Sequence, residues 1–173
     1  MEFKASLDTL SKALTAGVFI LLITIGQKSV RALTAAHGET ILILVHGGIL
    51  LLFVAILFGS YMYSVRSYSV TDDELIIQRP IGNRVIVCSD IKEIRKADKT
   101  EFSGTIRTFG NGGLFGYYGK FYNAKLGNMT WYVTQRKNSI IMLMKTGEKI
   151  IISPDDISMF DKIQAVIKHS DKE

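Results

Sequence analysis

The apolar residues of this chain are concentrated in its first third. Residues 13–26 carry no charged side chain, and residues 41–63 carry none apart from the ionisable His46. Beyond that second run, charged residues recur throughout and no apolar stretch is comparable in length. The division predicts a membrane-spanning helical hairpin over residues 1–63, followed by a water-soluble domain over residues 64–173.

The second apolar run is long enough to cross a bilayer. Its 23 residues reach about 34 Å as a helix, against a hydrocarbon core of about 30 Å. The first run has 14 residues, which reach only about 21 Å. It becomes long enough if the helix begins near Leu10 and continues to about Val30, with Lys12 snorkelling toward water. We therefore predict two transmembrane helices, over about 10–30 and 41–63.

A cleaved signal peptide is the competing interpretation of the first run. Lys4 and Lys12 would form its basic region, ahead of the apolar residues 13–26. Residues 34–36 would be the small-residue cleavage site, leaving about four residues ahead of the second span. Two spans joined by a short loop are the simpler arrangement.

Basic residues near the span ends favour an inside location for both termini. The terminal side of the hairpin carries more of them than the loop side, so we expect a multi-pass protein with cytoplasmic N- and C-termini. The single cysteine, Cys88, cannot form an internal disulfide, which fits a reducing compartment. The terminal side carries Lys4, Lys12, Arg66, Arg79 and Arg84, and the loop side carries Lys28 and Arg31.

Small and polar residues interrupt the apolar spans at a few positions. His46 lies close to the start of its span, where it can reach water or a backbone carbonyl. We expect Gly47 and Gly48 to allow close packing of the helices, and Ala13 and Gly17 favour the same contact. Neither span contains Asp or Glu, so a pump or ion carrier would lack ligands.

The domain contains short strand-like runs separated by turn residues, which predicts a small antiparallel barrel or sandwich. Residues 145–148 resemble a tight hairpin turn between two apolar strands. The expected strands are 68–70, 74–79, 84–88, 91–96, 104–109, 129–134, 139–144 and 149–152.

The pattern predicts that one amphipathic helix closes the chain. Ser153 is a suitable N-cap, and Pro154 suits the first helical position. Asp155 and Asp156 would complement the helix dipole in the first turn. One apolar stripe is expected, formed by Ile157, Phe160, Ile163, Gln164 and Ile167.

Charge and chemistry narrow the function classes. Residues 64–173 hold 17 basic and 13 acidic residues, a mild excess that suits an anionic membrane surface. It is too dispersed to indicate nucleic-acid binding. The histidines stand far apart at 37, 46 and 169, and Cys88 lies in an apolar strand. Because no nucleophile motif or metal-ligand spacing accompanies them, we expect a non-enzyme with no catalytic, cofactor-binding or metal site.

The densest local signal is residues 110–127, GNGGLFGYYGKFYNAKLG, with six glycines and five aromatic residues. It is not a phosphate loop, because Leu114 and Phe121 stand where that motif needs glycine and Ser or Thr. In a structural interpretation, the glycines permit positive φ and the rings fill a small core. In the other, Leu114, Phe115 and Phe121 point inward while the tyrosines face a membrane interface or a partner. The candidate interface residues are Tyr117, Tyr118, Lys120, Tyr122 and Lys125.

Residues 104–134 (GTIRTFGNGGLFGYYGKFYNAKLGNMTWYVT), then KIIISPDD and a closing helix, resemble the bacterial PH-like domain proteins. The resemblance covers the whole chain and is most specific in 113–123 and 151–156. It implies a small bacterial membrane protein with two N-terminal spans and no known activity. It also implies an α+β, mainly β domain: a PH-like antiparallel barrel or sandwich with a C-terminal capping helix.

Eukaryotic PH domains often bind phosphoinositides through a basic loop between their first two strands. By resemblance, the corresponding turn here is 80–83, flanked by Arg79 and Arg84. These two arginines are therefore the candidate lipid-headgroup residues.

Three functions remain open. The leading hypothesis is a module anchored at the bacterial inner membrane that binds a membrane or cytoplasmic protein, or copies of itself. The second is sensing of anionic lipids through Arg79, Arg84, Lys120 and Lys125. The third is a small accessory subunit of a membrane transport complex, whose hairpin packs laterally through Gly47 and Gly48.

Overall fold

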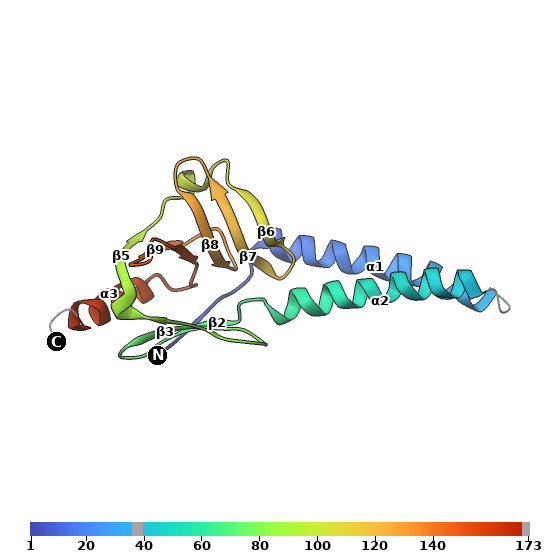
Figure 1. Ribbon diagram of the computed structural model, residues 1–173, viewed down its shortest axis with the longest axis horizontal. Coiled ribbons are helices and arrows are strands. Elements are labelled where there is room, and N and C mark those ends of the chain that lie inside the picture. The colour runs from blue at the N-terminus through green and yellow to red at the C-terminus, as the bar shows by residue number, and fades with distance from the viewer. Residues whose placement is uncertain (36–39, 171–173) are drawn as a thin grey trace.

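The computed structural model describes residues 1–35 and 40–170. Two long helices, α1 (Thr9–Ala35) and α2 (Thr40–Met62), form a hairpin that projects from a β-rich domain (Figure 1). The expected connecting loop, with Ala36 of the alternative cleavage site and His37, falls in 36–39, outside the described residues.

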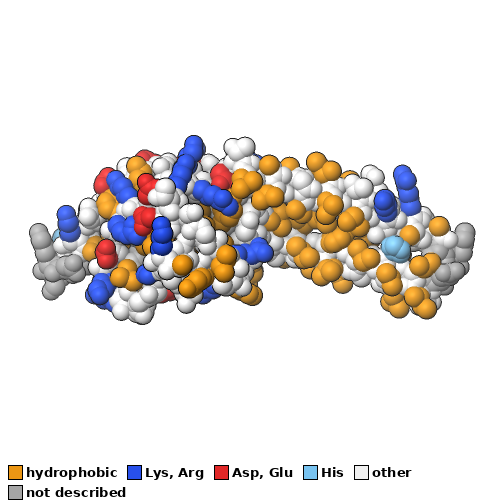
Figure 2. Space-filling model, turned by 90° about the horizontal axis from the view of Figure 1, so that it is seen from above, with side chains coloured by type: hydrophobic (Ala, Val, Ile, Leu, Met, Phe, Trp, Pro, Cys, Tyr) orange, Lys and Arg blue, Asp and Glu red, His pale blue; other side chains and the backbone are white. Residues whose placement is uncertain are grey.

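Both helices are long and apolar enough to cross a membrane. Their 27 and 23 residues reach about 40 Å and about 34 Å. Asp8 caps the start of α1, because its Oδ1 accepts a hydrogen bond of 2.7 Å from the backbone N–H of Ser11. Hydrophobic side chains cover much of the hairpin, whereas most charged side chains lie on the domain (Figure 2). Helices thus occupy both apolar runs, and the first is longer than expected at its loop end.

The expectation that small residues bring the two helices together was wrong. A methyl group placed on Gly17, Gly47 or Gly48 would find no described atom within 4 Å, so these glycines do not face the other helix. Gly26 of α1 does lie between the helices, because a methyl group placed on it would be 3.8 Å from the Leu50 side chain of α2. The two helices also contact through Ser29 Oγ and His46 Nδ1, which lie 3.4 Å apart.

A four-stranded antiparallel sheet forms one layer of the domain. Its outermost strand comes from the N-terminal end of the chain and places Phe3 opposite Tyr68. The sequence did not predict this strand, because three residues carry too little pattern to reveal a partner beyond both helices. In sheet order the strands are β1 (Glu2–Lys4), β2 (Ser67–Val70), β3 (Glu74–Gln78) and β4 (Arg84–Val87).

A six-stranded sheet forms the second layer. Its neighbouring strands are antiparallel except β8 and β10, which run parallel and place Trp131 opposite Ile151. The expected α+β, mainly β sandwich with a closing helix is confirmed, and this pair is its one departure from an antiparallel arrangement among the described strands. In sheet order the strands are β5 (Ile91–Lys96), β9 (Ile140–Met144), β10 (Lys149–Ile152), β8 (Gly127–Val133), β7 (Gly116–Asn123) and β6 (Ile106–Gly113).

The main hydrophobic core lies between the two sheets and under α3 (Ser158–Ser170). Alternate residues of β2, β3 and β10 point into it, as expected for the two-residue period of a strand, whereas β6 and β7 contribute none of its buried residues. Leu75 and Ile77 of β3 meet Ile150 and Ile152 of β10 in this core, and all four are fully buried. This enclosed core holds the layers that position the surfaces described below.

The closing helix begins later than the predicted N-cap Ser153. The Ser153 hydroxyl instead accepts hydrogen bonds from the backbone N–H groups of Thr134 (3.0 Å) and Gln135 (3.2 Å). Asp156 takes the capping role, because its Oδ1 accepts from the backbone N–H of Ser158 at 2.9 Å. The expected stripe does face the core: Ile163 is buried there, and Ile157, Phe160 and Ile167 pack against it.

Candidate functional site

The glycine and aromatic segment folds into the β6–β7 hairpin and the start of β8. Its turn docks onto both long helices at the domain end of the hairpin. The backbone N–H of Phe115 donates to Thr15 Oγ1 at 3.1 Å, and the Phe115 ring lies 6.1 Å from Phe19 and 5.7 Å from Tyr61 in edge-to-face geometry. The sequence had predicted that Phe115 points inward, into the domain core. The ring instead packs between the two helices.

Tyr118 also ties β7 to the helices. Its hydroxyl donates to the backbone carbonyl of Ser60 in α2 and accepts a 3.0 Å hydrogen bond from Asn111 Nδ2. Burial raises the pKa of the Tyr118 hydroxyl, so it remains a donor at neutral pH. This candidate interface residue is half-buried against the hairpin.

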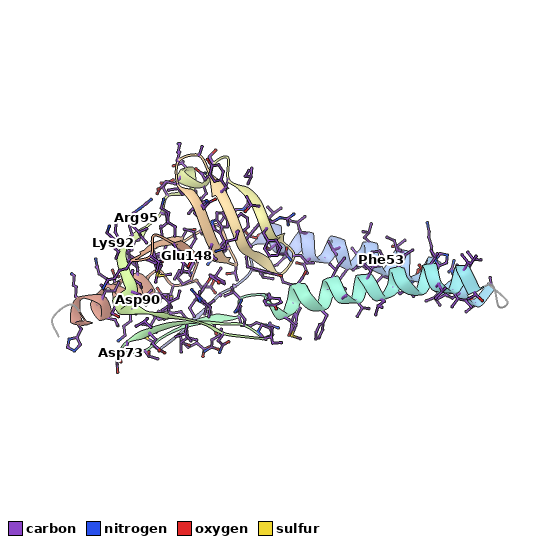
Figure 3. The ribbon with its side chains drawn as sticks, in the orientation of Figure 1. Phe53, Asp73, Asp90, Lys92, Arg95 and Glu148 are labelled. Carbon is purple, nitrogen blue, oxygen red and sulfur yellow. The ribbon has the colours of Figure 1, made fainter. Side chains whose placement is uncertain are left out.

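Lys120 and Arg84 converge on one carboxylate, although the sequence assigned them to separate sets. Lys120 Nζ lies 3.1 Å from Glu148 Oε1 and 2.7 Å from Thr130 Oγ1, and Arg84 Nη2 lies 3.8 Å from Glu148 Oε2. Burial raises the pKa of Glu148, but hydrogen bonds from Thr130 and Lys120 outweigh it and leave the pKa lowered. Both cations are thus already partnered. Glu148 lies within the β-rich domain, away from the hairpin (Figure 3).

Arg79 is half-buried at the base of α2. Its guanidinium lies 5.8 Å from the ring centres of Tyr63 and Tyr132, and it donates to the carbonyl of Gly82. The exposed Lys125 lies at the far end of β7 from the helices. The four expected headgroup cations are therefore not one patch: Arg84 and Lys120 come together, while Arg79 and Lys125 stand apart.

The outward orientation expected for Tyr117 was wrong. Tyr117 is 2% exposed and shares one face of β7 with Phe121, because alternate strand residues point the same way. The Arg136 guanidinium lies 4.8 Å from the centre of its ring. Its hydroxyl is 3.5 Å from the carboxylate of Asp8, the residue that caps α1. Tyr122, by contrast, is exposed as expected.

This face of the six-stranded sheet carries an open cavity of about 800 Å³. Aromatic and aliphatic side chains form its floor, and three cations stand around it. The cavity residues that carry the later argument are Tyr117, Phe121, Trp131, Lys99, Arg107 and Arg136. Sequence reasoning missed this site because its residues come from four separate segments. One available signal was the run of glycines on β6 and β7, which removes side chains above the floor.

Trp131 is the centre of the cavity floor. Its indole stacks on Phe121 at 4.4 Å and meets the edge of Phe102 at 5.3 Å. Only 6% of Trp131 is exposed, and its Nε1–H has no hydrogen-bond partner among the described residues. A buried donor without a partner costs free energy.

A short helix closes one end of the cavity. Phe102 and Lys99 belong to η2 (Lys99–Phe102), which is held by a bidentate ion pair between Arg95 of β5 and Glu101, at 2.9 and 2.6 Å. Figure 3 places Arg95 on β5 at the domain surface. The hydrogen bonds from Arg95 and from the backbone of Asp98 lower the pKa of Glu101 to about 2.

The edge strand β6 is exposed over most of its length, although its other side pairs with β7. Ile106 is 59% exposed and Phe109 is 77% exposed. Long unprotected edges with apolar side chains are uncommon, because their free N–H and C=O groups invite pairing with another chain. The edge is therefore a second candidate surface, which adjoins the cavity because Ile106, Arg107 and Gly112 of β6 also line the cavity.

The structure offers little to nucleophilic or metal chemistry. Burial raises the pKa of the Cys88 thiol to about 11, with a further contribution from the carboxylates of Asp73 and Glu74. The thiol is therefore protonated at neutral pH. Across residues 1–35 and 40–170, no three His, Cys, Asp or Glu side chains gather where they could hold a metal ion.

A family model described as "Bacterial PH domain" matches residues 66–166. No curated protein and no solved structure matches the chain. The matched region runs from the start of β2 into α3, and so includes the cavity and the β6 edge.

Proposed function

Since the chain belongs to the bacterial PH domain family, whose domains are protein- or lipid-binding modules and generally non-catalytic, we propose that it is a membrane-anchored adaptor. In this proposal the β6 edge docks an extended segment of a partner protein. The hairpin anchors the domain at the inner face of the bacterial cytoplasmic membrane, with both termini in the cytoplasm. Anchoring raises the local concentration of the module, so a modest intrinsic affinity suffices.

The exposed β6 edge is the observation that carries this proposal. A segment added beside β6 would pair with its free backbone groups, which provides affinity. Its apolar side chains would cover Ile106 and Phe109, which provides selectivity. The domain's net positive charge favours encounter with an acidic partner. The occupant is thus an extended segment that alternates apolar side chains with polar or acidic ones.

Site-specific photo-crosslinking in the native membrane tests this proposal. A photoreactive phenylalanine analogue replaces Phe109, and the matched control carries it at Val87, an exposed residue on the edge strand β4. We expect one discrete adduct from position 109 and none from position 87. The substitution Phe109→Glu should abolish co-purification of that partner, because it places a charge in the docked interface. Val87→Glu should leave co-purification unchanged.

Equal adducts from both positions, or none from position 109, would refute docking at β6. A crosslink from position 109 to another copy of this chain would identify the occupant of the β6 edge as a second copy rather than a partner protein.

Anionic lipid sensing through Arg79, Arg84, Lys120 and Lys125 is less well supported. Glu148 already binds two of these cations, and Arg79 is packed among aromatic rings. The transport-subunit hypothesis gains one supporting fact, since Gly47 and Gly48 are uncovered by the other described residues and could meet a neighbouring helix.

A further inference from the structure

We propose that the cavity on the outer face of the six-stranded sheet binds an anionic amphiphile, that is, an acidic group attached to an apolar chain or ring. This site shares Ile106, Arg107 and Gly112 with β6, but its ligand is an amphiphile rather than an extended segment, so it goes beyond the proposed function. It also differs from the turn 80–83, where the resemblance placed headgroup binding. The argument rests on the size, the floor and the rim of the cavity.

The size and floor of the cavity suit an apolar body. A volume of about 800 Å³ is in the range of pockets that hold small organic ligands. The floor is formed by Tyr117, Phe121 and Trp131, with Val133 and Ile151 beside them.

The rim of the cavity suits an acidic group. Every charged residue that lines it is a cation: Lys99, Arg107 and Arg136. None of the three takes part in an ion pair among the described residues, unlike Lys120, Arg84 and Arg95 elsewhere in the domain. Three uncompensated cations around one cavity favour a ligand with negative charge, and arginine can bind a carboxylate or phosphate through two hydrogen bonds.

One glycine of β6 makes room for a cation of the rim. The absence of a side chain at Gly112 leaves room for the Arg107 guanidinium, whose Nη1 lies 3.2 Å from the point where a Cβ would stand. Gly112 therefore allows the Arg107 guanidinium to lie over the cavity.

The position of the cavity allows either of two sources for the ligand. Its Tyr117 end lies beside Asp8, at the start of the first apolar helix, so a membrane lipid could supply the acidic amphiphile. A free fatty acid or a similar soluble amphiphile has the same chemistry. The experiment below separates the two sources.

Trp131 is the only tryptophan of the chain, so its fluorescence reports on this cavity alone. The full-length protein is placed in phosphatidylcholine nanodiscs and titrated with decanoate, with decanol and acetate as the neutral and the short-chain controls. We expect a saturable change in Trp131 emission with decanoate only. In nanodiscs that contain phosphatidylglycerol and no decanoate, the same change would assign the ligand to the bilayer, and its absence would assign it to a free amphiphile.

Charge variants make the result specific to the rim. The double substitution Arg107→Gln/Arg136→Gln should raise the apparent Kd for decanoate at least tenfold, whereas Arg107→Lys/Arg136→Lys should retain most of the affinity. Lys162→Gln, on the exposed side of α3, is the matched control and should change nothing. An equal response to decanol, an unchanged Kd in the glutamine variant, or no saturable response to either decanoate or phosphatidylglycerol would overturn the proposal.

Discussion

The two faces of the six-stranded sheet are made by the same strands but differ in what covers them. On the inner face, Ile150 packs into a core that is sealed by the other sheet and by α3. On the outer face, its neighbour Ile151 borders a cavity with cations around it. One face of the sheet is therefore filled for stability, and the other keeps space that a ligand can use. The sharpest way to examine this difference is to change adjacent residues that point in opposite directions.

The largest expected effect comes from truncating the filled face. Ile150→Ala should lower the free energy of unfolding by about 4 kcal/mol, because a fully enclosed site leaves a cavity when methyl groups are removed. Ile151→Ala should cost about 2 kcal/mol, because this side chain already borders open space. The midpoints of thermal unfolding should fall by roughly 3 °C per kcal/mol.

The buried Cys88 thiol provides the measurement for this pair. A fluorogenic maleimide should label the full-length protein only as the core between the sheets opens. Equal midpoints for the two variants would show that the outer face is packed as tightly as the inner one, against the comparison drawn above.

The next effect concerns a glycine on the open face. Gly119 has a φ of 119°, and an added Cβ would lie 2.4 Å from the carbonyl oxygen of Phe109. Gly119→Ala should therefore destabilise the β6–β7 hairpin by about 3 kcal/mol and lower the unfolding midpoint accordingly.

Gly47→Ala serves as its control, because an added methyl group at that position would meet no described atom within 4 Å. It should leave the midpoint unchanged or slightly raised. A tolerated alanine at 119 would contradict the close approach of the two strands.

The smallest effect is a local loosening of the cavity cover in acid. The pKa of Glu101 is lowered in the folded state to about 2 from its ordinary value of 4.5, so its contribution to stability is present above pH 4.5 and is lost as pH falls toward 2. Over that interval η2 should detach from the cavity and Trp131 emission should shift to longer wavelength. Far-UV circular dichroism should stay constant, since the enclosed core does not depend on this ion pair.

Glu101→Gln should show the shifted emission already at neutral pH and no further change in acid. If Trp131 emission stays constant from pH 4.5 to pH 2 in the unmodified protein, the ion pair between Arg95 and Glu101 does not hold η2 against the cavity.

The features predicted from the sequence are those whose cause is local. Two long apolar runs become helices, and short β-branched runs become β2 to β5, β9 and β10. The features that were missed depend on distant partners. The Ser153 hydroxyl is engaged by the end of β8, so it cannot cap the closing helix. β7 was not expected as a strand because each of its first four residues is a glycine or lies beside one, and only pairing with β6 and β8 holds it extended.

The candidate site could be predicted only in part for the same reason. The segment 110–127 was correctly singled out, but the direction of Tyr117 depends on strand register, which no local pattern reveals. Arg107, Trp131 and Arg136 come together only because β8 turns back beside β7. The sequence alone does not show that cations from separate segments lie close together, because only the folded sheet brings them to one place.

The pairing of β1 with β2 has a consequence for how the protein is made. The ribosome synthesises Phe3 before either helix, yet its partner Tyr68 emerges only after both. In the proposed membrane-anchored arrangement, the sheet can therefore close only when the two ends of the hairpin lie on one side of the bilayer. A chain inserted with a single crossing would separate β1 from β2 and leave Tyr68 without Phe3 opposite it. Pairing of β1 with β2 would thus depend on insertion of both helices as a pair.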